Sequence, residues 1–263
     1  MSKKLFGKFF ILLLVVGLLF AVAPTGQAQA ADEPCTTACY VSPTGNDANT
    51  GLEGNPFLTI QKAIDTVSDG GTIHLAEGNY VENPITTITL NKSFSLIGAN
   101  DGSGTALSTI QGTLSLENSL STDSYLIEYI NFKQVSGTDS LVIKQIDNLT
   151  VRNSVFAGAG TVTGRAIQMN TGSNGNQNIL IDNCRFENLY YTGIQGSVNN
   201  LTVKDSEFEN LKSGINLQSG GSDLTVTDST FSVVAQGAGN DTYGIRLASD
   251  TAGTGESLNV KAI

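Results

Sequence analysis

The chain has 263 residues, with 14 Lys and Arg against 24 Asp and Glu and a formal net charge of −10 at pH 7. An acidic surface repels nucleic acid and anionic membranes, so the composition argues against both as partners. Glycine is abundant, with 29 residues, and Gly, Asn, Ser and Thr separate short apolar runs, which is typical of all-β folds with many turns.

Residues 1–30 have the pattern of a secretory signal peptide. A basic start at residues 2–8 precedes an apolar run at 9–23, and Ala28-Gln29-Ala30 supplies the small residues of a cleavage site. The run is shorter than the roughly 20 apolar residues that span a bilayer, so cleavage is favoured over an uncleaved anchor. We therefore expect a secreted or cell-surface protein with no membrane span after cleavage.

Residues 31–71 carry a pair of cysteines and the one helix that we expect. Cys35 and Cys39 lie in an exported, oxidising setting, which favours a disulfide, with two free thiols as the alternative. Thr59 is a candidate N-cap, and Gly70-Gly71 is the expected end of the helix. The apolar residues between them fall at helical spacing: Ile60, Ala63, Ile64 and Val67.

Four later segments share one pattern, close to Asn-Leu-Thr-Val-x-Asp-Ser-x-Phe. They are Asn148–Phe156, Asn178–Phe186, Asn200–Phe208 and Asp223–Phe231. A repeat of this length with alternating apolar residues predicts a solenoid of stacked strands, in which each unit buries its apolar face against its neighbours. We expect the solenoid to occupy residues 72–263 and the helix to cover its first coil.

Residues 257–263 begin a further unit, and then the chain stops. This pattern predicts a truncated solenoid, whose uncapped C-terminal coil exposes apolar core and strand edge. End-to-end or edge-to-edge association is the expected consequence.

Four stretches outside the repeats complete the pattern: Tyr40–Gly45, Asn55–Asp65, Gly70–Tyr80 and Ser95–Gly98. Together with the repeats they resemble secreted right-handed parallel β-helix proteins of the pectin-lyase-like superfamily, including their N-terminal cap region. The resemblance implies an all-β fold, a right-handed parallel β-helix with a short N-terminal capping α-helix. It leaves the activity open, because the superfamily includes lyases, glycoside hydrolases, epimerases, adhesins and phage tailspikes.

The aligned repeats predict which side chains are buried. The positions of Leu201, Val203, Ser206 and Phe208 point inward, with a bend near Asp205. One unit has Cys184 where the other units have serine. We interpret this cysteine as a small buried side chain and not as a nucleophile.

Outward positions of adjacent repeats carry charges of opposite sign, with Asp182 beside Lys204 and Arg185 beside Glu207. Solvated ion pairs are one interpretation. The other is a saccharide groove, where Lys204 or Arg185 removes the proton α to the carboxyl group of a uronate that calcium neutralises. The resemblance implies this lyase chemistry, although no diagnostic motif of one lyase family is visible. Paired hydrolase carboxylates would come from Asp182, Glu187, Glu207 and Glu209.

Two pairs of acids stack on neighbouring coils. Glu187 and Glu209 follow their phenylalanines, and Asp205 and Asp228 continue a bend column that starts with two asparagines. Stacked like charges are destabilising unless a cation relieves them, and Lys212 or calcium could do so. Calcium is therefore the one cofactor that we predict, and a hydrogen-bonded ladder is the alternative interpretation of the bend column.

The loops predict a shallow trough on the repeats. Long loops at residues 157–164 and 236–243 flank two short ones, and Tyr190 and Tyr191 lie on a short loop between them. The tyrosines could stack against sugar rings, or one could be buried and the other exposed. We therefore expect a carbohydrate-interacting module that binds a polysaccharide or cell-surface glycan. The alternatives are a calcium-dependent polysaccharide lyase or glycoside hydrolase, and a structural adhesin segment.

Overall fold

The structure is a computed structural model that describes residues 33–89, 91–117, 122–135, 137–158, 164–170, 175–218, 223–233, 242–247 and 260–262. The chain divides into two compact units, Met1–Glu33 and Pro34–Ile263, and every described helix and strand belongs to the second. The predicted signal peptide lies outside the described residues, and so does most of both predicted long loops.

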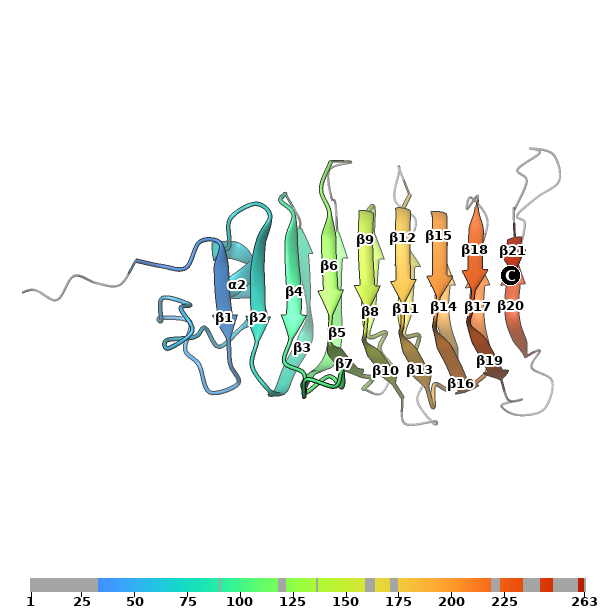
Figure 1. Cartoon of the computed structure of the whole chain (residues 1–263), viewed down its shortest axis with the longest axis horizontal. Coiled ribbons are helices and arrows are strands. Elements are labelled where there is room, and N and C mark those ends of the chain that lie inside the picture. The colour runs from blue at the N-terminus through green and yellow to red at the C-terminus, as the bar shows by residue number, and fades with distance from the viewer. Residues whose placement is uncertain are drawn as a thin grey trace, which may run out of the picture. The chain divides into compact units, whose positions relative to one another are not determined.

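Parallel strands dominate the unit Pro34–Ile263. In the described part of the chain, nine of them form one sheet in the order β1-β2-β4-β6-β9-β12-β15-β18-β21, which Figure 1 shows as a row of neighbouring arrows. Their bounds are Ala38–Val41, Gly71–Leu75, Phe94–Gly98, Tyr125–Glu128, Asp147–Arg152, Gln177–Asp182, Asn199–Lys204, Leu224–Thr227 and Val260–Ala262. The sheet begins at Ala38, ahead of the predicted start of the solenoid at residue 72.

The second described sheet has twelve strands in two rows that meet at β5 (Ser108–Glu117), which also pairs with β3 (Gly78–Thr89). The row β7, β10, β13, β16 and β19 comprises Ile130–Lys133, Val155–Ala157, Arg185–Glu187, Glu207–Leu211 and Thr230–Val233. The row β8, β11, β14, β17 and β20 comprises Leu141–Lys144, Ile167–Asn170, Thr192–Gly196, Ser213–Leu217 and Tyr243–Leu247.

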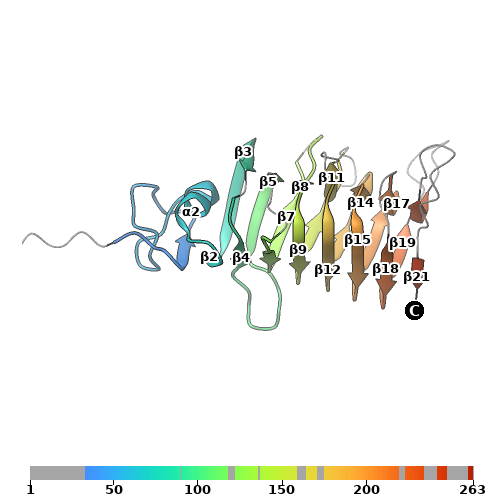
Figure 2. The same ribbon diagram turned by 90° about the horizontal axis from the view of Figure 1, so that it is seen from above.

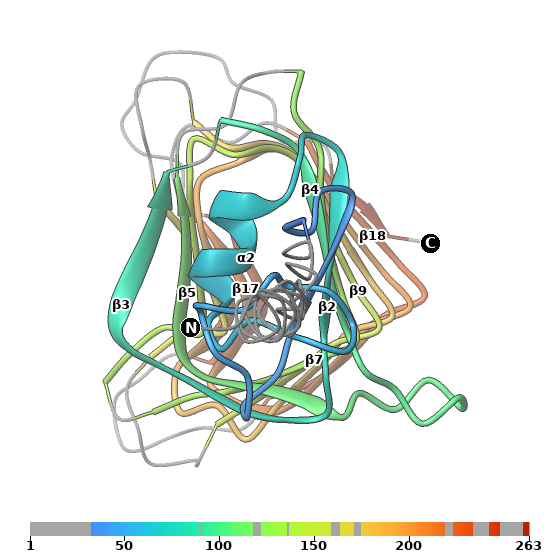
Figure 3. The same ribbon diagram turned by 90° about the vertical axis from the view of Figure 1, so that its left-hand side faces the viewer.

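The long strand β5 explains how one sheet becomes two rows. Its first half pairs with β7 and its second half with β8, and Gly112 between them has a φ of 118°, which favours glycine. Each later coil therefore contributes one strand to each of three rows. Figure 3, viewed from the N-terminal side, shows these rows enclosing the interior.

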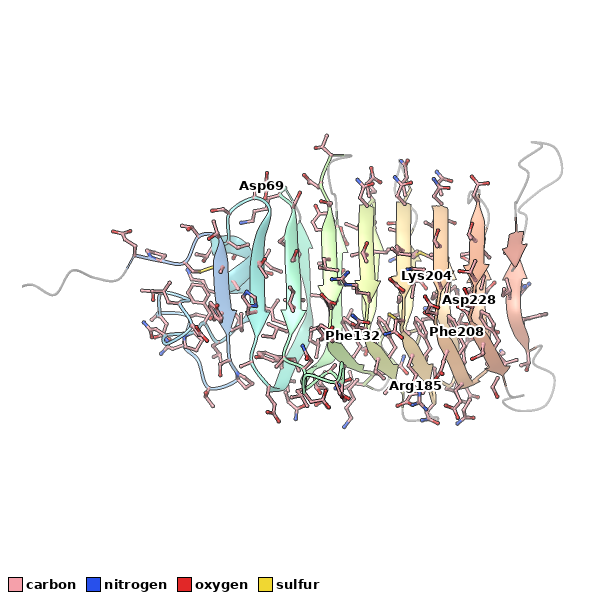
Figure 4. All side chains as sticks on the ribbon, viewed as in Figure 1. Asp69, Phe132, Arg185, Lys204, Phe208 and Asp228 are labelled. Carbon is pink, nitrogen blue, oxygen red and sulfur yellow. A yellow bond between two sulfur atoms is a disulfide. The ribbon has the colours of Figure 1, made fainter. Side chains whose placement is uncertain are left out.

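The core follows the predicted register. Leu201, Val203, Ser206 and Phe208 are each at most 1% exposed. Phenylalanine rings of successive coils stack with centroids 4.4 to 4.9 Å apart, and Figure 4 labels two of them. The stack comprises Phe132, Phe156, Phe186, Phe208 and Phe231.

The predicted helix is α2, Ile60–Thr66, which buries its apolar side in the same core as the strands. Thr59 is its N-cap, as predicted, and accepts a hydrogen bond from the backbone N–H of Lys62 at 3.2 Å. The predicted glycine stop is wrong, because Val67 is already extended and Gly71 begins β2. In Figure 3, α2 lies across the near end of the interior, where a cap is needed.

The cysteines behave as the sequence indicates. Cys35 and Cys39 form a disulfide, and Cys184 is a free thiol that is 2% exposed. Among the described residues, no helix is long and apolar enough to cross a membrane.

The predicted further unit at 257–263 is described only as β21, which pairs with β18. The repeat aligns Val260 with Val226, but the structure pairs Val260 with Leu224, so the predicted register is wrong by two residues. End-to-end association stays a prediction.

Candidate functional site

A column of bends separates the nine-stranded sheet from the row that contains β10, β13 and β16. Asn153, Asn183, Asp205 and Asp228 occupy it with φ angles of 51°, 50°, 49° and 49°. Asn and Asp tolerate this left-handed conformation better than other non-glycine residues. The Asn183 Nδ2 donates to Asn153 Oδ1 at 2.7 Å, and Asn153 donates to Glu128 at 2.8 Å. The predicted ladder is therefore confirmed for the asparagines.

A groove of about 320 Å³ lies beside this column. One wall is Gly104–Ala106, in the loop between β4 and β5 that projects from the strands in Figure 2. The polar groups of the opposite side come from the bends and from the first residues of β13 and β16. They are Asn153, Asn183, Arg185, Asp205 and Glu207. The residues that line the groove thus include two asparagines, two acidic residues and an arginine.

The wall of the groove is held in place by Asp101, although this residue is exposed. Its Oδ1 accepts hydrogen bonds from the backbone N–H groups of Ser103 at 2.9 Å and Thr105 at 3.0 Å. The side-chain hydrogen bond from Ser103, followed by the backbone hydrogen bond from Thr105, lowers the pKa of Asp101 to about 2. Asn131, one coil further on, donates to the carbonyl of Ala106 at 2.8 Å and ties the loop to β7.

Arg185 makes different ion pairs from those we predicted. Its backbone pairs with Glu207, as the register predicts, but its guanidinium contacts Glu187 at 3.0 Å and Glu209 at 2.7 Å. The cation therefore lies between the two stacked carboxylates, which was the role suggested for Lys212. Hydrogen bonding to Glu209, with the charge of Glu187, raises the pKa of Arg185, so its geometry does not favour proton abstraction.

Lys204 and Asp182 form the predicted ion pair, with Nζ and Oδ2 3.0 Å apart. They end β15 and β12, and their register continues a column of alternating charge that starts with Glu128 and Arg152. Figure 4 labels Lys204 and Arg185 on different rows of strands. The four catalytic candidates thus flank one bend column, but of these only Arg185 and Glu207 line the groove.

The structure provides no assembled metal centre at the candidate ligands. Glu187 and Glu209 pair in register and share Arg185, and Asp205 and Asp228 occupy the bend column. Within the part of the chain that the structure describes, no three His, Cys, Asp or Glu side chains are grouped to hold a metal ion. Calcium binding stays a prediction.

Tyr190 and Tyr191 lie outside the groove, at the other end of β13. Their ring centroids are 6.3 Å apart with planes tilted by 44°, and Tyr191 is 36% exposed. Arg165 Cζ lies 5.9 Å and Lys212 Nζ 5.1 Å from the centroid of the Tyr191 ring. The Tyr191 ring, which we expected to stack on a sugar, therefore already lies beside two cations.

The 100–106 loop was the part of the site that our sequence analysis missed. It lies outside the repeats, and our sequence analysis gave it no role. Its signal was Asp101-Gly-Ser-Gly-Thr105, in which a carboxylate precedes small and hydroxyl residues that can turn back to it. The sequence alone did not show that this turn would lie beside coils 50 to 100 residues further along the chain.

The stacked parallel rows, the amide ladder and the phenylalanine column define a right-handed parallel β-helix. The family described as "Right handed beta helix region" matches residues 108–258, and the chain belongs to that family. The right-handed parallel β-helix is the fold that the resemblance implied. No curated protein matches the chain in sequence.

Two solved structures are similar to this chain. A rhamnogalacturonan lyase has a TM-score of 0.59 at 16% identity, and the match covers 86% of this chain and 65% of the lyase chain. Pectate lyase Pel9A has a TM-score of 0.58 at 15% identity, and the match covers 81% of this chain and 58% of the lyase chain. The chain spans less than two thirds of either lyase, and at such identity the likeness concerns the fold alone.

Proposed function

We propose that the protein is a secreted or cell-surface carbohydrate-binding β-helix module that holds a saccharide in the groove beside the bend column. The observation that carries this proposal is the groove of about 320 Å³ with amide, carboxylate and guanidinium groups on one side. That volume is at the lower end of the range of small-molecule sites. The fold-level likeness to two lyases, one named for pectate and one for rhamnogalacturonan, supports a carbohydrate ligand.

The lining suits hydroxyl groups, which both donate and accept hydrogen bonds. The carboxylates of Asp205 and Glu207 accept from hydroxyls, and the amide of Asn183 supplies an acceptor oxygen at a fixed bend. Because ladder hydrogen bonds and strand pairing already fix the backbone at these positions, little conformational freedom is lost on binding. The groove is therefore preorganised.

The charge of the groove favours a neutral saccharide. Arg185 is already matched by two carboxylates, so Asp205 and Glu207 leave the groove acidic. A uronate would be repelled there unless a cation bridged it to these acids. Calcium would supply that bridge if the ligand is an acidic polysaccharide.

A glycan array followed by calorimetric titration of the best oligosaccharide tests the proposal. Glu207→Gln should weaken binding about tenfold, because a charge-assisted hydrogen bond contributes roughly 1.5–3 kcal/mol. Glu77→Gln, an exposed glutamate in the turn after β2, makes the same charge change away from the groove and is the control. Equal affinities of the two variants, or an array without a hit, would remove the proposal.

A calcium-dependent lyase is the second candidate, favoured by the two similar structures both being lyases. Lys204 would be its base, although the Asp182 carboxylate lies 3.0 Å away and must be displaced first. The assay is the absorbance of unsaturated uronates released from pectate or alginate with calcium present. Activity that Lys204→Ala abolishes would establish this function, and no absorbance from the wild-type protein would exclude it for these substrates.

A further inference from the structure

Three residues from successive coils meet at the corner opposite the bend column. Arg165 precedes β11, Tyr191 precedes β14, and Lys212 lies between β16 and β17. The backbone N–H of Ser213 donates to the carbonyl of Tyr191 at 3.1 Å, so the coils of Tyr191 and Lys212 are directly paired. Both cations lie within 6 Å of the Tyr191 ring, at 5.9 and 5.1 Å. We call Arg165, Tyr191 and Lys212 the cationic corner.

The positive charge of the cationic corner is only partly neutralised. The guanidinium of Arg165 contacts Asp139 Oδ2 at the long distance of 3.5 Å, while the backbone N–H of Arg165 donates to Oδ1 of the same carboxylate at 2.7 Å. Among the described residues, no carboxylate lies within ion-pair distance of Lys212, although the chain carries 24 acidic residues. A lysine ammonium and an arginine guanidinium beside one half-exposed tyrosine form a local positive site on an acidic protein.

Unsatisfied polar atoms gather at the same corner. Buried groups nearly always have a hydrogen-bond partner, so each exception requires an explanation. Within the described ranges, the buried side-chain atoms without one are Gln134 Oε1, Ser140 Oγ, Arg165 Nε, Gln168 Oε1 and Thr242 Oγ1. Four of these residues lie in the turns between the β7 and β8 rows, and Gln168 is in β11, which follows such a turn. Of these atoms, only Arg165 Nε belongs to the cationic corner, and as an N–H donor it is the one that an anion could satisfy.

We propose that the cationic corner is a binding site for an oxyanion, the carboxylate or sulfate group of a saccharide, and that it works without a metal ion. Lys212 and Arg165 pair with the anion, while the Tyr191 ring holds both cations beside it. This site rests on its own observations and not on the groove. Glu207 begins β16 and Lys212 follows its end, so a left-handed bend at Asn210 lies between them and they are at most roughly 17 Å apart along the chain.

The test is a titration of the full chain in EDTA with sodium sulfate in one arm and sodium galacturonate in the other, followed by amide NMR shifts. Lys212→Gln should weaken the bound anion at least tenfold. Lys62→Gln is the matched control, because Lys62 also lies over an aromatic ring, that of Phe57 at 5.6 Å, but belongs to α2. We expect this control to change the dissociation constant less than twofold.

The two arms distinguish the chemical source of the anion. Saturable galacturonate binding identifies a carboxylate site, and saturable sulfate binding identifies a sulfate site. Binding in neither arm would overturn the proposal, and so would equal weakening by Lys212→Gln and Lys62→Gln, which indicates general electrostatics. Since neither substitution affects the groove, the outcome is independent of the carbohydrate-binding test with Glu207→Gln.

Discussion

Asn183 and Asp205 occupy the same bend of successive coils, with φ angles of 50° and 49°, but only Asn183 has an amide that extends the ladder. Asn183 donates to Asn153 at 2.7 Å, whereas the carboxylate of Asp205 has no proton to donate to Asn183. The ladder therefore ends at Asn183. Beyond it the column presents carboxylates, and one of them lines the groove.

Extending the ladder should stabilise the protein. In Asp205→Asn, the new amide can donate to Asn183 Oδ1, and the like charge next to Asp228 is removed. We expect a gain of about 1 kcal/mol in the free energy of unfolding, measured by urea denaturation. Glu77→Gln removes one negative charge from an exposed turn and serves as the control. A gain in the free energy of unfolding no larger than that of the control would show that the carboxylate of Asp205 does not destabilise the bend column.

The phenylalanine column should dominate the stability of the middle coils. Phe186 is fully buried and stacks on Phe156 and Phe208, so Phe186→Ala should lower the free energy of unfolding by about 3–5 kcal/mol. Phe231 is only partly buried, and the same substitution there should cost less. Urea denaturation of both variants checks whether the loss of stability is smaller for the partly buried ring. A larger loss for Phe231→Ala than for Phe186→Ala would contradict this expectation.

The wall of the groove should loosen in acid. The folded pKa of Asp101 is about 2, below its ordinary value of 3.8, because Ser103 and Thr105 donate to the carboxylate. The stability that this carboxylate contributes is therefore complete above pH 3.8 and is lost as the pH falls through about 2. The amide NMR shifts of Ser103 and Thr105 should titrate with that lower midpoint and lose the transition in Asp101→Asn. A midpoint near 3.8 would show that the turn is not held by Asp101.

The buried thiol should be inert. Desolvation by burial raises the pKa of Cys184 to about 12, and its side chain is 2% exposed. At pH 8 a thiol reagent should not label the native protein, but it should label one thiol per chain after unfolding in urea without reductant, since Cys35 and Cys39 stay linked. Rapid labelling of the native protein would contradict the burial of Cys184.

The repeat made most of the fold predictable. Alternation of apolar residues determines which side chains are buried, and the spacing of Phe156, Phe186, Phe208 and Phe231 aligns the coils without any structural knowledge. Asparagines at the bend could be recognised because a stacked amide both donates and accepts. The helix was visible from Thr59 and the spacing of the apolar residues that follow it.

The site was less predictable. The alignment of the repeats indicates which backbone segments are neighbours, but it does not indicate which groups the end of a long side chain contacts. Arg185 is paired in register with Glu207, yet its guanidinium reaches Glu187 and Glu209 instead. Nor could the repeat place the 100–106 loop, which lies outside it and becomes a wall only when the chain coils. Local pattern determines register, whereas the groove depends on contacts distant in sequence.

Mapping a bound oligosaccharide by amide NMR tests the central claim most directly. With the ligand selected on a glycan array, we expect the largest shift changes at Thr105, Asn183, Asp205 and Glu207. In Glu207→Gln, about tenfold more ligand should be needed to reach them. Shift changes confined to other rows of strands, with these four amides unaffected, would contradict a saccharide site in the groove beside the bend column.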